Sequence, residues 1–301
     1  MSKTLISIVG PTAIGKTSLS IDLAKAFETE IISADSRQFF REMNIGTAVP
    51  SSEELAAAPH HFIQHISVED AYSVGDFERD ALQKLEQLFQ RHDKVIMVGG
   101  SGLYVDAVTK GLDEFPEIDP QIRISLNDLF AAEGLPALQK QLSQLDPEYY
   151  SEVDTENPHR LIRALEVSLG TGKPYSSFRK KKAAQRPFKS VLIGLTADRE
   201  VIYDRINRRV DLMLEQGLLE EAKALAGKKH LNALNTVGYK ELFAFLEGRC
   251  SLEEAVEEIK KNTRRFAKRQ LTWFRKNPEI HWFDHITPTE EIIDMIKKID
   301  Q

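Results

Sequence analysis

Eight consecutive residues near the amino terminus have the types and spacing of a phosphate-binding loop: Gly10, Pro11, Thr12, Ala13, Ile14, Gly15, Lys16 and Thr17. The loop follows a short apolar stretch and precedes a segment with helical periodicity. In that context the loop N–H groups and the helix dipole attract an anion, Lys16 adds a positive charge, and the Thr17 hydroxyl can hold Mg²⁺. The pattern predicts a cofactor-binding site for a diphosphate or triphosphate, as in nucleotide-binding and ATP-binding proteins.

A carboxylate at the end of a second apolar run is the next candidate. Asp35 follows residues 31–34, which predict a strand, so it should lie at the carboxyl edge of a parallel sheet, where ligands bind. A metal ligand, a helix cap and a general base all fit this position. A third run, residues 95–98, ends in Gly-Gly-Ser-Gly and lacks the carboxylate that most P-loop ATPases and GTPases use for their metal. A nucleotide or small-molecule kinase is an alternative that rests on the phosphate-binding loop alone.

Basic residues cluster in three places in a chain with a net charge of −6. Residues 263–276 contain six basic residues and no acidic one, and residues 178–182 form a second basic run. The helical periodicity of the first segment predicts a docked helix. Its outer face would carry the cations Arg264, Arg265, Lys268 and Arg275, and another side would carry Phe266, Trp273 and Phe274. Arg160 and Arg163 share one helix face. These basic clusters fit three alternatives: an ordinary solvated surface, a nucleic-acid site on an enzyme, or a noncatalytic RNA-binding module.

The elements that must position these residues follow from periodicity. Four apolar runs, at residues 5–9, 31–34, 95–98 and 191–195, predict buried parallel strands, and amphipathic helices are expected between them, at 17–27 and 77–89. This is the pattern of an α/β fold, a P-loop doubly wound parallel sheet. Further helices are expected at 198–226 and 252–276, in the C-terminal part of the chain.

A segment without strands interrupts the α/β pattern. Asp119, Asp146 and Asn157 each precede a proline, which predicts three helix starts, and Gly134 and Gly170 predict helix ends. We therefore expect residues 1–113 and 190–301 to form the catalytic core, with residues 114–189 as a helical insertion domain.

Composition sets the remaining limits. The 301 residues are 42% hydrophobic and 29% charged, which predicts a globular protein. Cys250 is the single cysteine, which excludes an intramolecular disulfide and fits a reducing compartment. No apolar run reaches membrane-spanning length and no secretion signal is evident, so we expect a cytoplasmic monomer without a membrane or an obligatory protein partner. His61 and His65 have metal-ligand spacing, but no nearby residue completes a set, and we predict no metal there.

Eight ordered motifs resemble the bacterial tRNA dimethylallyltransferases, a family of tRNA prenyltransferases. They run from residue 10 to residue 277 and read GPTAIGKT, ADSRQFF, NIGTAVP, PHHFIQ, VGGSGLY, HRLIRALEV with TGKP, VGYKE and TRRFAKRQLTWFRKN. The resemblance implies that the donor is dimethylallyl diphosphate and that the loop and Mg²⁺ hold its leaving diphosphate. It implies that the acceptor is the exocyclic amine of adenosine 37, beside the anticodon of tRNAs that read codons beginning with U.

The resemblance also assigns roles to residues of this chain. Asp35 matches the family's general base, Ser101 stands where the family has a threonine near the reacting groups, and Arg209 matches a diphosphate-binding arginine. These three are the expected catalytic residues, and Thr17 is the expected metal ligand. Contact with the tRNA anticodon stem-loop is implied for these residues: Asp35, Ser36, Arg37, Gln38, Ser101, Arg123, His159, Arg160, Leu161, Ile162 and Arg163.

Overall fold

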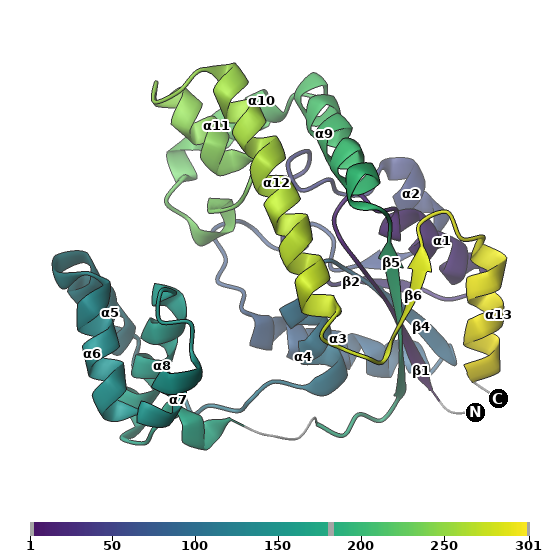
Figure 1. Cartoon of the computed structure of the whole chain (residues 1–301). Coiled ribbons are helices and arrows are strands. Elements are labelled where there is room, and N and C mark those ends of the chain that lie inside the picture. Colours follow the sequence, from purple (N-terminus) through teal and green to yellow (C-terminus); the bar gives the residue numbers. More distant parts are fainter. Residues whose placement is uncertain (1–2, 180–183, 300–301) are drawn as a thin grey trace. The chain divides into compact units, whose positions relative to one another are not determined.

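A six-stranded parallel sheet organises the larger part of the chain (Figure 1). The computed structural model describes residues 3–179 and 184–299. The strand order is β3-β2-β4-β1-β5-β6, and every neighbouring pair is parallel. The strands are β1 (Thr4–Val9), β2 (Ile31–Ser33), β3 (His60–His61), β4 (Lys94–Val98), β5 (Lys189–Thr196) and β6 (Ile280–Asp284).

The central strands are apolar on both faces because helices cover both sides of the sheet. On β1, Ile6 and Ile8 pack into one hydrophobic cluster, while Leu5 and Val9 pack into another on the opposite face. The first cluster includes side chains of α1 (Lys16–Ala26), α9 (Arg199–Glu215) and α13 (Thr289–Ile299); the second includes α3 (Val74–Phe89) and α4 (Gly102–Lys110). The predicted doubly wound α/β fold and its four strands are confirmed, whereas the edge strands β3 and β6 were not predicted.

The remaining helices of this part cover the carboxyl end of the sheet. They are α2 (Ser52–Ala57), α10 (Leu218–Leu225), α11 (Tyr239–Leu246) and α12 (Leu252–Phe274). The prediction of one helix over residues 198–226 is wrong, because Gly217 has a φ of 100° and separates α9 from α10. A left-handed residue of this kind ends a helix and changes the chain direction.

The helical segment forms a separate compact unit, Gly111–Ala184, beside a unit made of Met1–Lys110 and Gln185–Gln301. Its helices are α5 (Pro120–Glu133), α6 (Leu135–Leu145), α7 (Pro147–Glu152) and α8 (Pro158–Thr171). The three predicted Asp or Asn caps are confirmed, since each side chain accepts a hydrogen bond from a first-turn N–H. The predicted end at Gly170 is wrong: the helix continues to Thr171, and Gly172, with a φ of 68°, forms the left-handed cap.

Two further observations concern the chain as a whole. No helix in residues 3–179 and 184–299 has both the length and the apolar character needed to cross a bilayer. The second basic run of the sequence, residues 178–182, falls largely outside the described residues, so only Phe178 and Arg179 can be placed; Arg179 pairs with Glu152 at 2.5 Å.

Candidate active site

The phosphate-binding loop connects β1 to α1 and its shape depends on glycines. Gly10 has a φ of 142°, and a Cβ atom there would lie 2.5 Å from the carbonyl oxygen of Leu195 on β5. Gly15, with a φ of 111°, precedes the first turn of α1, which carries no acidic residue. Ala13 also has a positive φ, of 63°, and its carbonyl accepts a 2.7 Å hydrogen bond from Arg205 Nε. The loop is therefore fixed around a helix N-terminus suited to an anion.

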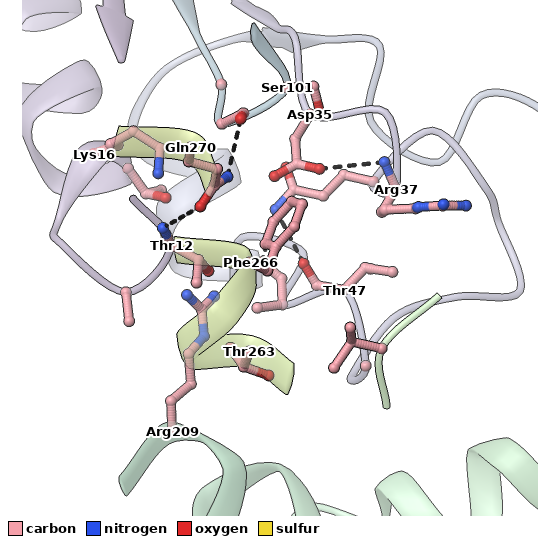
Figure 2. A pocket seen from close by; sticks show the side chains of 18 of the residues that line it. Thr12, Lys16, Asp35, Arg37, Thr47, Ser101, Arg209, Thr263, Phe266 and Gln270 are labelled. Carbon is pink, nitrogen blue, oxygen red and sulfur yellow. Dashed lines mark hydrogen bonds between the residues drawn. The ribbon is translucent and has the colours of Figure 1, made fainter. Parts of the chain in front are cut away.

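Lys16 lies inside this loop. Its Nζ donates to the carbonyl oxygens of Gly10 and Pro11, at 3.1 and 2.7 Å. Burial lowers the pKa of Lys16 from 10.5 to about 8; the Asp35 carboxylate acts in the opposite direction and the Arg209 guanidinium adds to the lowering. Burial also lowers the pKa of Arg209, again against the effect of Asp35. Lys16, Arg209 and Asp35 are thus electrostatically coupled around one space (Figure 2).

That space is a cavity of about 1000 Å³ at the carboxyl end of the sheet. The cavity brings together these predicted site residues: Thr12, Ala13, Ile14, Gly15, Lys16, Thr17, Asp35, Ser36, Arg37, Gln38, Ser101 and Arg209. Gly10 and Pro11 contribute the two carbonyls that hold Lys16. The strand ends of β1, β2 and β4 supply most of these residues, as expected for ligand sites in open parallel sheets.

Asp35 and Ser101 lie on neighbouring loops after β2 and β4. One Asp35 carboxylate oxygen accepts a 3.2 Å hydrogen bond from the N–H of Arg37. The Ser101 hydroxyl lies 3.1 Å from the Ser36 hydroxyl and also accepts from the Ser36 N–H at 3.3 Å. Gly99 permits this approach, since a Cβ there would lie 2.5 Å from the carbonyl oxygen of Ala34. A carboxylate and a hydroxyl therefore face the cavity that also contains the phosphate loop.

Gln270 on α12 was not predicted as a site residue. It is 6% exposed, its Oε1 accepts from the Thr12 N–H at 2.9 Å, and its Nε2 donates to the Gly100 carbonyl at 2.9 Å. It thereby ties the phosphate loop to the loop after β4. The sequence carried one signal: Gln270 falls between Ala267 and Phe274 on the buried stripe of the helix, where a polar residue needs partners.

The three aromatic residues predicted to share one side of α12 differ in their exposure. Phe266 and Trp273 are 38% and 39% exposed and line the cavity, while Phe274 is 3% exposed. The Trp273 indole donates to Asp106 at 2.9 Å. On the basic side, the Arg264 guanidinium donates a 2.7 Å hydrogen bond to the Asn207 side chain on α9, so this cation binds a residue of the protein itself.

The remaining predicted RNA contacts lie in the helical unit. The buried carboxylate of Glu166 accepts from both Arg123 and Arg163 at 3.0 Å, and both guanidiniums stay largely accessible. His159 and Arg160 are exposed. Leu161 and Ile162 are buried in the core of this unit, so their side chains stabilise the fold instead of facing a ligand.

Comparisons with known proteins identify the family. Residues 38–277 match the family model described as IPP transferase. The chain is 65% identical over 297 residues to a tRNA dimethylallyltransferase of Christiangramia forsetii, with 99% of this chain and 98% of that one covered. The chain belongs to the IPP transferase family.

Solved structures of IPP transferases share this fold. The full-length tRNA isopentenylpyrophosphate transferase of Bacillus halodurans is 39% identical, with a TM-score of 0.73 and coverage of 99% of this chain and 96% of that one. A eukaryotic dimethylallyltransferase acting on tRNA is 27% identical, with a TM-score of 0.78 and coverage of 95% and 75%. Family membership makes the chain a prenyltransferase and supports prenyl transfer over the kinase alternative.

Proposed function

We propose that this protein transfers the dimethylallyl group of dimethylallyl diphosphate to the exocyclic amine of adenosine 37 in tRNAs that read codons beginning with U. One observation carries the proposal: the Asp35 carboxylate and the phosphate-loop cation Lys16 line the same cavity and are electrostatically coupled. A diphosphate cradle beside a carboxylate suits a reaction in which a diphosphate leaves while an amine loses a proton. A kinase can also place a carboxylate beside its acceptor hydroxyl, so the preference for prenyl transfer over phosphoryl transfer rests on the family match.

In the proposed reaction the allylic C–O bond breaks as a new C–N bond forms. The electron pair of the C–O bond stays on the diphosphate, whose growing negative charge is stabilised by the loop N–H groups, Lys16 and Arg209. The adenine amine is a weak nucleophile, because its lone pair is delocalised into the ring. Asp35 takes the proton that the amine releases, and the Ser101 hydroxyl, which contacts the neighbouring Ser36, is proposed to help orient the amine.

The residues also fit a Mg²⁺ ion. The Thr17 hydroxyl lies at the start of α1 and lines the cavity, and Mg²⁺ typically binds one or two protein oxygens together with phosphate oxygens and water. The described residues contain no cluster of three or more His, Cys, Asp or Glu side chains, and this mode of binding does not require one. When bound, the ion would neutralise part of the diphosphate charge.

The RNA contacts of the proposal involve both units. Asp35 lies at the carboxyl end of the sheet. For its amine to reach this carboxylate, the target adenosine must leave the stack of the anticodon loop. Gln38 belongs to the cavity wall and is proposed to hold the extruded base. Arg123, His159, Arg160 and Arg163 are proposed to contact the phosphates of the anticodon stem-loop. Because tRNA is the substrate, we place the reaction in the cytoplasm.

The test of the base is the Asp35→Asn variant, which removes the proton acceptor but keeps the side-chain size. Transfer should fall by roughly 10²- to 10⁴-fold, the usual contribution of general base catalysis. Affinity for unmodified tRNA and for isopentyl diphosphate, a saturated analogue that cannot react, should change little. Turnover near the wild-type rate would remove Asp35 from the base role.

The test of the reaction is nucleoside mass spectrometry of unmodified tRNA incubated with the protein, Mg²⁺ and either dimethylallyl diphosphate or ATP. A dimethylallyl mass gain on adenosine is expected only with the prenyl donor. ATP consumption without that gain would refute the proposal and return the loop to phosphoryl transfer.

A further inference from the structure

Two sequence motifs near the cavity have no role in the proposed reaction, and the structure joins them. The first is the segment Asn44–Pro50, whose residues Gly46, Thr47, Ala48 and Pro50 line the cavity. The second begins α11 and contains Tyr239, which is fully buried. Both meet at one side chain, the carboxylate of Glu221 on α10.

Glu221 accepts three backbone hydrogen bonds from consecutive residues of the first motif. The N–H groups of Asn44, Ile45 and Gly46 donate to its two oxygens at 3.1, 2.8 and 2.9 Å. The Tyr239 hydroxyl donates a fourth bond, at 2.6 Å. Burial, with the hydrogen bond to Glu221, raises the pKa of Tyr239, so its hydroxyl stays protonated as the donor. One carboxylate thus satisfies donors from two segments that lie almost 200 residues apart in sequence.

The loop shape that results is a strained one. Ala48 has a φ of 50°, in the left-handed region that only a few non-glycine residues adopt. At Gly46 there is no space for a side chain, because a Cβ would lie 2.7 Å from the Tyr239 ring. Such a conformation persists only where the surroundings over-determine it, and Glu221 contributes by holding the three residues at the start of this turn.

The loop in turn holds Gln38. Its Nε2 donates to the carbonyl oxygens of Thr47 and Ala48, at 3.3 and 2.9 Å, and its Oε1 accepts from the Ser33 hydroxyl at 3.3 Å. The amide plane of Gln38 is therefore set by two carbonyls that the Glu221-bound turn presents. Glu221 itself is not among the residues that line the cavity.

We infer that Glu221 is a positioning residue for the acceptor nucleoside, acting through the 44–48 turn on Gln38. This inference rests on the proposed function, because it takes the ligand of Gln38 to be the target adenosine. Loss of the Glu221 charge leaves the phosphate loop, Lys16 and Asp35 in place. The effect should therefore appear on the tRNA side of the reaction and spare the diphosphate side.

The experiment compares Glu221→Gln with Glu220→Gln. The two residues are adjacent on α10 and the substitutions change charge equally, but Glu220 is exposed, and its carboxylate pairs with Lys223 at 3.6 Å. A glutamine at 221 has one acceptor oxygen, so its amide must face at least one backbone N–H. We expect KM for tRNA to rise, with kcat/KM for tRNA lower by roughly 10- to 100-fold, the scale of an ångström-sized misplacement. The Kd for isopentyl diphosphate should stay within twofold of wild type.

A second pair of measurements separates positioning from general loss of structure. If Glu221 acts through Gln38, then Glu221→Gln should cost little when Gln38→Ala is already present, whereas independent effects would multiply. Tyr239→Phe removes only the fourth donor and should give a smaller loss in the same direction, which keeps the inference testable if Glu221→Gln does not fold. Multiplicative effects, or equal losses for tRNA and isopentyl diphosphate, would overturn it. Wild-type protein without prenyl transfer would instead defeat the proposed function.

Discussion

The buried cation of the phosphate loop makes a quantitative prediction about pH. The pKa of Lys16 falls from 10.5 to about 8 because the ammonium is buried. At about 1.4 kcal/mol for each pH unit of difference, the charged side chain costs the folded state about 3 kcal/mol at pH 7. The unfolded chain keeps the Lys16 proton up to the higher pKa. The free energy of unfolding should therefore increase as the pH rises and the buried side chain loses its charge. Between pH 7 and pH 9 the cost should fall by about 1.3 kcal/mol.

The assay is urea unfolding of wild type and Lys16→Met at pH 7, 8 and 9. Methionine is unbranched, only one atom shorter than lysine, and cannot titrate. The unfolding free energy of wild type minus that of Lys16→Met should increase by about 1.3 kcal/mol across this range. Lys25→Met, at an exposed position of the same helix, should follow the wild-type curve. A difference between wild type and Lys16→Met that does not change with pH would refute the assignment of a buried ammonium.

The same titration should control donor binding. With a pKa of about 8, most Lys16 side chains are charged at pH 7 and roughly a tenth are charged at pH 9. The last ionisation of a phosphate ester lies near a pKa of about 6, so the ligand charge hardly changes over this range. Affinity for isopentyl diphosphate should therefore weaken by up to about tenfold from pH 7 to pH 9 in wild type and stay constant in Lys16→Met. Calorimetric titration measures both.

Three further predictions concern the scaffold around the site. Gly172→Ala should lower the free energy of unfolding by about 1 kcal/mol, because its φ of 68° disfavours a side chain, and thermal denaturation can measure this. Gln270→Leu should cost about 2–3 kcal/mol in urea unfolding, since it leaves the Thr12 N–H and the Gly100 carbonyl without their buried partner. Burial would raise the pKa of Glu30, but hydrogen bonds with two histidines outweigh it and lower the pKa. The resulting stabilisation is present above pH 4.5 and is lost as the pH falls through the pKa of the folded state. Glu30→Gln should therefore give a shallower acid-unfolding curve.

The central sheet could be predicted from the sequence because its strands are buried on both faces. Such strands appear in the sequence as nearly continuous apolar runs, and this is the pattern of β1, β2, β4 and β5. The edge strands have different causes. β3 is only two residues long, and β6 mixes buried Ile280 with exposed polar residues, so pairing with β2 and β5 creates strands that no local pattern indicates.

The site divides in the same way between local and tertiary causes. The phosphate loop, Asp35 and Ser101 follow strand ends, and a sequence pattern can indicate a strand end. Gln270 and Glu221 could not be found so directly, because their roles depend on partners such as Thr12 and Gly46 that lie more than 170 residues away. A buried polar residue on an apolar helix stripe is a signal of such a role, but it does not name the partner.

The end of β4 is consistent with the proposed role of this phosphate loop, which is to hold a leaving diphosphate. Many P-loop enzymes use a carboxylate at such a strand end to hold the metal for phosphoryl transfer. Here the strand ends in glycines, and a Cβ at Gly100 would collide with the amide of Gln270. The amide occupies that space and links the loop after β4 to Thr12 through two neutral hydrogen bonds. A strand-end carboxylate stands instead after β2, and in the proposed reaction Asp35 receives a proton from the incoming amine while the loop retains the departing diphosphate.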